Sequence, residues 1–135
     1  MKNKFRYRLF LGIIILSLSS CSVFHKGKKE TIEDFDQFYN RFHSDPAFQM
    51  SRINFPIRGK MIDGDNEKTW TKSNWALLKV KIYDVDKKKY KVSYKKTEKS
   101  FVEKFWLENS GFSSEYIFEV IDNKWMLVYA LDVNI

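Results

Sequence analysis

Hydrophobic and polar residues change their spacing along this chain, and each change predicts a different element. Residues 9–18 are almost purely apolar. Residues 31–44 then place apolar side chains three and four positions apart, which is typical of one stripe of an amphipathic helix: Ile32, Phe35, Phe38, Tyr39 and Phe42. From residue 52 onward the apolar residues mostly alternate with polar ones, which is typical of strands with one buried face.

The helix over 31–44 has recognisable ends in the sequence. Thr31 is a suitable N-cap, and Pro46 cannot continue a helix, so the helix is expected to end near Ser44 and Asp45. His43 falls in the last turn, where it suits the helix dipole. We therefore expect His43 to cap the helix rather than to take part in chemistry.

The middle of the chain predicts shorter elements. Residues 52–58 alternate as a half-buried strand, and Pro56 within it indicates an edge strand or a bulge. Residues 63–66 form a turn, and residues 70–78 a short helical segment. Residues 79–83 and 89–95 predict a hairpin whose lysines face water and discourage edge pairing. The alternative for these lysines is a surface that binds acidic partners.

The last third of the chain predicts three strands, over 101–108, 115–121 and 124–133, with a tight turn at Asp122 and Asn123. The last two strands are apolar at consecutive positions, which indicates that both of their faces are covered. The predicted fold class is therefore α+β: an N-terminal helix packed on a curved, mainly antiparallel sheet.

The first 21 residues have the architecture of a secretory signal. Basic residues occupy positions 2, 4, 6 and 8, the apolar run over 9–18 is about half as long as a membrane-spanning helix, and Ser19 and Ser20 precede Cys21. The sequence Leu18-Ser19-Ser20-Cys21 resembles the lipobox of bacterial lipoproteins. Cys21 is the only cysteine in the chain, so an intramolecular disulfide is impossible.

The lipobox resemblance implies how the chain is processed and where it resides. A peptidase would cut between Ser20 and Cys21, the Cys21 sulfur would carry a diacylglyceryl group, and the new amine would be acylated, for instance with palmitate. Ser22, in place of an acidic residue, implies the outer membrane of a Gram-negative bacterium. The predicted organisation is a signal peptide over 1–20, a lipidated cysteine with its tether over 21–30, and one α+β domain over 31–135.

Cleavage of the signal would also change the charge of the protein. Residues 1–20 hold four of the 24 Lys and Arg residues and none of the 17 acidic residues, so the formal net charge falls from +7 to +3. Nucleic acid is therefore not an expected partner, since its binding needs a basic footprint. Lysines 26, 28 and 29 of the tether either rest on anionic head groups or form a solvated linker.

Within residues 31–135, a second resemblance concerns the fold. The stretch Phe48–Pro56, the pair Trp70 and Trp75, and the final hairpin over 115–133 are similar to an uncharacterised family of bacterial lipoproteins with the nuclear transport factor 2-like (NTF2-like), or cystatin-like, fold. This resemblance implies a roll with a conical pocket. One clear helix precedes the sheet where two or three are usual, which implies a shallow or open pocket.

The first functional hypothesis is a non-catalytic module that binds a small molecule or an envelope protein in this pocket. Arg52 would be its charged contact, with four aromatic residues lining it: Trp70, Trp75, Tyr116 and Tyr129. The alternative for each aromatic residue is core packing, and for Arg52 an ion pair with an acid such as Asp45.

Two other hypotheses stay open. Relatives of the fold imply acid–base chemistry with Asp and Tyr or His, and here Glu103 or Glu119 could be a buried carboxylate with a raised pKa, because His25 lies in the tether. No nucleophile elbow or phosphate loop is present, and Asp63-Gly64-Asp65-Asn66 lacks the distal Glu of a calcium loop, so no enzyme, metal or cofactor is expected. The third hypothesis is an adaptor, or a homodimer, that pairs through the sheet.

Overall fold

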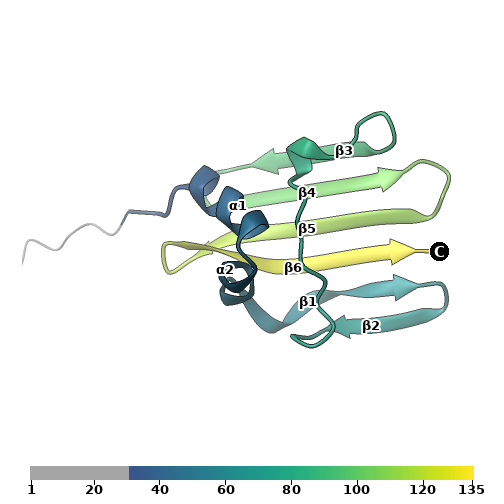
Figure 1. The fold of residues 1–135 in the computed structure, drawn as a ribbon, viewed down its shortest axis with the longest axis horizontal. Coiled ribbons are helices and arrows are strands. Elements are labelled where there is room, and N and C mark those ends of the chain that lie inside the picture. The colour runs from purple at the N-terminus through teal and green to yellow at the C-terminus, as the bar shows by residue number, and fades with distance from the viewer. Residues whose placement is uncertain (1–30) are drawn as a thin grey trace, which may run out of the picture.

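A computed structural model describes residues 31–135, which fold around one six-stranded sheet (Figure 1). The strand order is β2-β1-β6-β5-β4-β3. Neighbouring strands are antiparallel except β1 and β6, which are parallel. The strands are β1 (Ile53–Asp63), β2 (Asn66–Trp70), β3 (Lys91–Lys96), β4 (Ser100–Leu107), β5 (Phe112–Ile121) and β6 (Lys124–Asn134).

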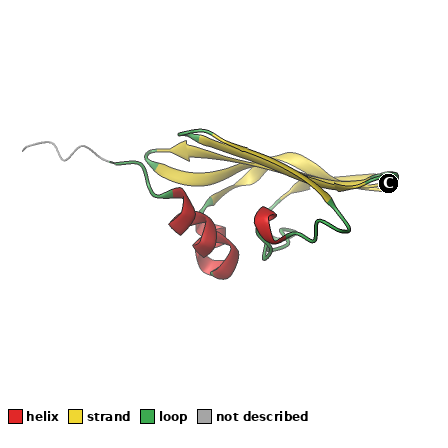
Figure 2. Ribbon diagram, turned by 90° about the horizontal axis from the view of Figure 1, so that it is seen from above, coloured by secondary structure: helices red, strands yellow, loops and turns green. Residues whose placement is uncertain are grey.

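Two helices and a long crossover cover one face of the sheet. Helices α1 (Phe35–Ser44) and α2 (Pro46–Ser51) lie on the same side as the 3-10 helix η1 (Ile82–Asp84) (Figure 2). The crossover, residues 71–90, runs between the two edge strands β2 and β3. We call this side the covered face. The other side, the open face, has no described helix or loop packed on it (Figure 2). The predicted α+β class, with an N-terminal helix on a mainly antiparallel sheet, is confirmed.

The core lies between α1 and the covered face, and it is mainly aromatic. The predicted apolar stripe is confirmed from Phe35 to Phe42, which are all but fully buried, whereas Ile32 lies before α1 and is 38% exposed. The ring centroid of Phe42 lies 5.2 Å from that of Phe118 in β5, and that of Phe35 lies 4.7 Å from that of Phe101 in β4. Burial of side chains of this size stabilises the fold by about 1.5–3 kcal/mol each.

The start of α1 differs from the prediction. Asp34, rather than Thr31, is the N-cap, and its carboxylate accepts a hydrogen bond from the backbone N–H of Gln37 at 2.8 Å. The preceding residues are extended because Glu33 is bound to the β5–β6 turn. Its backbone N–H donates to the carbonyl of Asn123 at 2.9 Å, and its own carbonyl accepts from the indole of Trp125 at 3.0 Å. Tertiary contacts therefore take residues 31–33 out of the helix.

Asp45 ends α1 and begins α2, a helix that the sequence analysis missed. Pro46 stands at the first turn of α2, and the carboxylate of Asp45 accepts from the backbone N–H of Phe48 at 3.0 Å. The predicted end of the first helix before Pro46 is confirmed. A proline at this position starts a helix as readily as it ends one.

Strand β1 carries a bulge. Of the two predictions made from Pro56, an edge strand or a bulge, the second is therefore confirmed. The strand is not an edge strand, because β2 and β6 flank it. Its register with β6 shifts between Ile53 and Arg58, the stretch that contains Pro56. At Gly59, where φ is +90°, a Cβ atom would lie 2.0 Å from the carbonyl oxygen of Ala130. Only glycine permits β1 and β6 to approach so closely.

The predicted hairpin of residues 79–83 and 89–95 is wrong. Its second half becomes the edge strand β3, but its first half lies in the crossover and ends in η1. The predicted helical segment over 70–78 is also absent: Trp70 closes β2, a strand that the sequence analysis missed, and no helix follows it before η1. Val80 and Ile82 alternate with lysines, but only Ile82 is buried: its side chain is 2% exposed, whereas that of Val80 is 60% exposed.

The three C-terminal strands are confirmed as β4, β5 and β6, with Asp122 and Asn123 at φ of 49° and 61° in the turn. The prediction that both faces of the last two strands are covered is wrong. Buried residues such as Phe118 and Leu127 face the helices, whereas alternate residues face the open side. Side chains of neighbouring strands half-bury the apolar residues there: Val102, Ile117, Tyr129, Leu131 and Val133.

Several predictions concern residues outside the described part. The signal peptide of residues 1–20, the lipidation of Cys21, the tether over 21–30 and the position of His25 all belong to this group. Among the described residues, no helix is long and apolar enough to cross a membrane.

Candidate functional site

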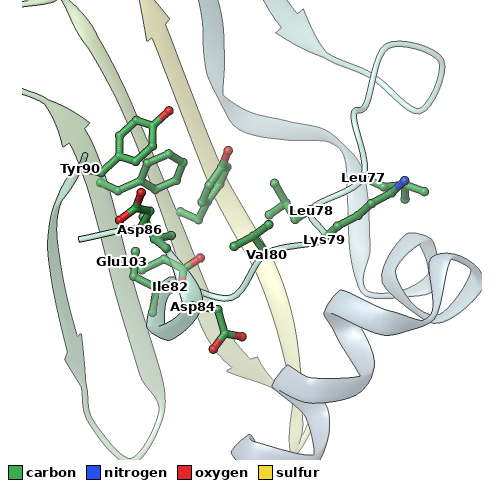
Figure 3. A pocket seen from close by; sticks show the side chains of 12 residues that line it. Leu77, Leu78, Lys79, Val80, Ile82, Asp84, Asp86, Tyr90 and Glu103 are labelled. Atoms are coloured by element: carbon green, nitrogen blue, oxygen red, sulfur yellow. The ribbon is translucent and has the colours of Figure 1, made fainter. Parts of the chain in front are cut away.

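A pocket with a volume of about 530 Å³ lies between the crossover and the covered face (Figure 3). Residues 77–86 of the crossover form one wall, and β4 and β5 form the other. The lining is mostly apolar, with aromatic rings from the sheet side and aliphatic side chains from the crossover side. It comprises Leu77, Leu78, Lys79, Val80, Ile82, Asp84, Val85, Asp86, Tyr90, Glu103, Phe105 and Tyr116.

Glu103 is the polar residue of this lining that is buried most deeply. The alternation of β4 places Glu103 on the covered face between Phe101 and Phe105, and the side chain is 3% exposed. The hydroxyl of Tyr39 in α1 donates a short hydrogen bond to its Oε2 atom. Within residues 31–135, the other carboxylate oxygen has no hydrogen bond to the protein. Glu103 therefore offers one acceptor atom to the pocket.

The hydroxyl of Tyr39 joins three parts of the structure. It donates to Glu103 in β4 and accepts from the backbone N–H of Ile82 in the crossover at 3.0 Å. Tyr39 itself belongs to α1 and is 2% exposed. One buried hydroxyl thus fixes the positions of helix, strand and crossover around the carboxylate.

Burial dominates the protonation of this pair. It raises the pKa of Glu103 from 4.5 to about 7, although the hydrogen bond from Tyr39 acts in the opposite direction. Burial and the nearby carboxylate raise the pKa of Tyr39 far above its ordinary value. At neutral pH, Glu103 is therefore divided between its acid and its carboxylate, while Tyr39 keeps its proton and remains a donor.

Tyr116 lies opposite Glu103 on the neighbouring strand and also lines the pocket. Its hydroxyl donates to the carboxylate of Asp132 at 2.8 Å. Burial and this carboxylate raise the pKa of Tyr116. The phenol therefore contributes its ring to the pocket, while its hydroxyl already donates a hydrogen bond within the sheet.

Gln49 attaches the wall of the pocket to the helices. Its side chain is 1% exposed, and its amide nitrogen donates to the carbonyls of Phe42 at 2.7 Å and Leu78 at 2.8 Å. Its amide oxygen accepts from the indole of Trp75 at 3.1 Å and from the backbone N–H of Leu78 at 2.9 Å. The sequence analysis missed this residue, because a single glutamine beside apolar residues gives no periodic signal.

Of the aromatic residues predicted to line a pocket, the structure places Tyr116 in the lining and three elsewhere. Trp70 is a core residue, 2% exposed, whose indole donates to the carbonyl of Ala130 at 3.0 Å. Trp75 packs on Trp70 with ring centroids 5.2 Å apart. Tyr129 pairs with Ile117 on the open face.

Arg52 also lies away from the pocket, in an ion pair. Its two terminal nitrogens each lie 2.8 Å from a carboxylate oxygen of Glu33, and its guanidinium lies 4.5 Å from the centroid of the Phe48 ring. Asp45, which the sequence suggested as partner, pairs with Arg41 at 3.2 Å. Arg52 therefore anchors the segment before α1 to the start of β1.

The remaining candidates divide between the two faces. Glu119 lies on the open face, because its neighbours Phe118 and Val120 pack into the core. His43 lies in the last turn of α1, where its Nδ1 atom lies 2.8 Å from the carbonyl of Tyr39, and burial lowers the pKa of its ring. The Nε2 atom of His43 is buried without a hydrogen-bond partner among the described residues. These same residues hold no cluster of three acidic, His or Cys side chains suited to a metal.

Comparisons with known proteins agree on the fold. A protein-family model matches residues 33–134. A cystatin-like protein of Bacteroides caccae is 28% identical, with a TM-score of 0.57 over 76% of this chain and 77% of its own. A protein of Bacteroides uniformis is 24% identical, with a TM-score of 0.55 over 75% and 77%. An NTF2-like protein of Bacteroides fragilis is 21% identical, with a TM-score of 0.54 over 78% of this chain and 49% of its own.

No curated protein matches the chain.

Proposed function

This chain belongs to the family whose model matches residues 33–134, and it shares its fold with solved NTF2-like and cystatin-like proteins; we propose that it is a lipid-anchored binding module of the cell envelope. The pocket between the crossover and the sheet is the observation that carries the proposal. Its volume of about 530 Å³ lies within the range of about 300–1,000 Å³ usual for small-molecule sites. Its lining is apolar with a few polar groups, which also suits such a site.

The arrangement of polar groups supports binding over catalysis. Tyr39 donates a hydrogen bond to Glu103, and Tyr116 donates a hydrogen bond to Asp132. Neither phenol is therefore free to stabilise negative charge that develops on a substrate, as an acid–base enzyme of this kind requires. Glu103 remains a candidate for a general base, because its pKa of about 7 suits proton transfer at neutral pH.

A screen for ligands tests the pocket. The purified chain in phosphatidylcholine nanodiscs is heated with a library of small apolar compounds, and a compound at 100 times its Kd adds about 2.7 kcal/mol of stability. The substitution Val80→Trp narrows the pocket at a residue that is 60% exposed, and it should abolish the shift in Tm. Ile121→Trp, at an exposed site outside the pocket, is the matched control. A library in which no compound shifts the Tm contradicts the proposal.

The anchor is a separate part of the proposal and has its own test. Cys21 would carry a diacylglyceryl group and hold the domain on the outer membrane of a Gram-negative bacterium, since two or three acyl chains are needed for stable attachment. Intact-mass spectrometry of the native protein should show a chain that starts at Cys21 with added lipid mass. Cys21→Ser should release the protein from the membrane fraction. An unmodified chain that starts at Met1 contradicts the anchor.

The open face favours a second candidate, an adaptor or homodimer that pairs through the sheet. Half-buried apolar residues, among them Ile117, Tyr129 and Leu131, lie on this face, and apolar side chains that stay accessible side by side are typical of interaction sites. Light scattering over a range of protein concentrations tests the homodimer, and Ile117→Lys should reduce the mass of a dimer to that of a monomer. A strict monomer at all concentrations contradicts it.

A further inference from the structure

The charged side chains that line the pocket are mostly acidic. Three carboxylates, those of Asp84, Asp86 and Glu103, stand against the single ammonium of Lys79. Asp84 already has a partner, since the ammonium of Lys81 lies 3.5 Å from its carboxylate. Within residues 31–135, Asp86 and Glu103 take part in no ion pair. The lining therefore keeps two carboxyl groups, those of Asp86 and Glu103, that no cation of the described residues contacts in an ion pair.

The hydrogen-bonding groups of the pocket also favour one kind of ligand. The hydroxyls of Tyr39 and Tyr116 already donate hydrogen bonds to Glu103 and Asp132. What the deep end of the pocket still offers is the second oxygen of Glu103, which is an acceptor when the carboxyl is ionised. An alkylammonium group has three donors and no acceptor, as the side chain of Lys shows. The aromatic rings of Phe105 and Tyr116 line the same space, and ring faces attract cations.

From this geometry, we propose that the pocket selects apolar amines, with the ammonium group on Glu103 and the apolar body against Phe105, Tyr116 and the leucines of the crossover. The inference rests on the proposed binding function and names its ligand class. Asp86 adds negative charge to the same pocket, so it assists in attracting the cation. A carboxylate ligand would meet unfavourable charge at both residues.

Protonation gives the proposal a second signature. An ammonium beside Glu103 favours the carboxylate and so lowers its pKa. Since the pKa of Glu103 is about 7 in the free protein, binding at pH 7 should release about half a proton per ligand. The other titratable groups around Glu103 are Tyr39 of α1, Lys79, Tyr83, Asp84 and Asp86 of the crossover, Tyr90 before β3, and Tyr116 of β5.

The test compares three probes with the same apolar body: 4-phenylbutylamine, 4-phenylbutanol and 4-phenylbutyrate. Each is titrated by calorimetry into the chain in phosphatidylcholine nanodiscs, with empty nanodiscs as the blank, in two buffers that differ in ionisation enthalpy. We expect the amine to bind at least about tenfold more tightly than the alcohol, and the carboxylate more weakly than both. Only the amine should release protons.

Two substitutions assign this preference to Glu103. Glu103→Gln should weaken the binding of the amine at least about tenfold and abolish proton release. The affinity of the alcohol should stay within a factor of about three of its value for the native chain. Glu119→Gln, which changes the same group on the open face of the sheet, should leave all three affinities unchanged. Because Glu103→Gln alters a buried hydrogen bond, Asp86→Asn provides a second variant at an exposed residue and should weaken the amine alone.

The outcomes separate this inference from the proposed function. Equal binding of amine and alcohol, or tighter binding of the carboxylate, would overturn the amine preference and leave the pocket as a binding site. An amine preference that survives in both Glu103→Gln and Asp86→Asn would also overturn it. Saturable binding of none of the three probes would count against the pocket itself.

Discussion

The hydroxyl of Tyr39 donates to the carboxylate of Glu103, although 64 positions separate the two residues in the chain. The same hydroxyl accepts from the backbone N–H of Ile82. Helix, strand and crossover therefore meet at one oxygen atom, deep in the wall of the pocket.

Tyr39→Phe should destabilise the protein by about 1–3 kcal/mol, because it leaves a buried N–H and a buried carboxyl group without their partner. It should also raise the pKa of Glu103 further, since the hydrogen bond from Tyr39 lowers that pKa. Urea unfolding measures the first effect, and carboxyl chemical shifts measured against pH give the second. Tyr83→Phe, at a residue that is 40% exposed, is the control. Equal stability of the two variants would contradict this role of Tyr39.

Stability should depend on pH through Glu103. Its pKa is about 7 in the folded state and 4.5 ordinarily, so the folded state binds the proton more tightly. The carboxyl therefore contributes stability below about pH 4.5, and this contribution is lost as the pH rises to about 7, a change of about 3 kcal/mol. In Glu103→Gln this loss should disappear.

The control for this prediction is His43, which acts in the opposite direction. Burial lowers its pKa, so its contribution is present above its ordinary pKa of 6.5 and is lost as the pH falls. The unfolding free energy of Glu103→Gln is therefore subtracted from that of the native chain at each pH from 4.5 to 8. The contribution of His43 is the same in both proteins and cancels in this difference. Curves that stay parallel over this range would refute the assignment.

Gln49→Leu should be among the most damaging single substitutions outside the aromatic core. It removes four hydrogen bonds and leaves groups of Phe42, Trp75 and Leu78 unsatisfied, so we expect a loss of about 3 kcal/mol or more. Amide hydrogen exchange should also accelerate at Leu78, as the crossover separates from the helices. Gln37→Leu, at an exposed position of α1, should change stability by less than about 0.5 kcal/mol. Unchanged exchange at Leu78 would show that other contacts hold the crossover.

The pair of Arg52 and Glu33 should contribute measurably to stability, unlike the exposed pair of Arg41 and Asp45. Arg52 is bidentate and half-buried, and Glu33 also accepts from the backbone N–H of Trp125. A double-mutant cycle with Arg52→Met and Glu33→Gln should give a coupling energy of about 1–3 kcal/mol. The same cycle at Arg41 and Asp45 should give about 0.5 kcal/mol or less. Equal coupling energies would mean that partial burial adds nothing to the first pair.

The parts of the fold that the sequence predicted well depend on local patterns. The stripe of α1 and the strands β4, β5 and β6 follow from the spacing of apolar residues, and the positive φ angles of Asp122 and Asn123 follow from the turn chemistry of short polar side chains. The crossover could not be predicted in this way. Residues 79–83 alternate as a strand does, but β3 already occupies the edge of β4. Which segment pairs with β4 depends on contacts between residues far apart in the chain, and a local pattern does not show them.

The site was harder to predict than the fold, because its members look like core residues in sequence. Tyr39 belongs to the apolar stripe of α1, and only the structure shows what its hydroxyl binds. Glu103 was one of two candidate carboxylates, and the alternation of β4 and β5 decides between them by turning Glu103 inward and Glu119 outward. Consecutive apolar residues in β6 suggested two covered faces, whereas one of these faces is open.

The parallel pairing of β1 with β6 has a consequence for the order of events during synthesis. The last strand to be made lies in the middle of the sheet, between the first strand and β5. Until β6 arrives, the nascent polypeptide exposes two unpaired strand edges, and folding through such distant contacts is slow. The sheet can therefore be completed only after β6 has been synthesised. For a chain exported as we propose, this delay keeps the polypeptide unfolded while it is threaded across the membrane.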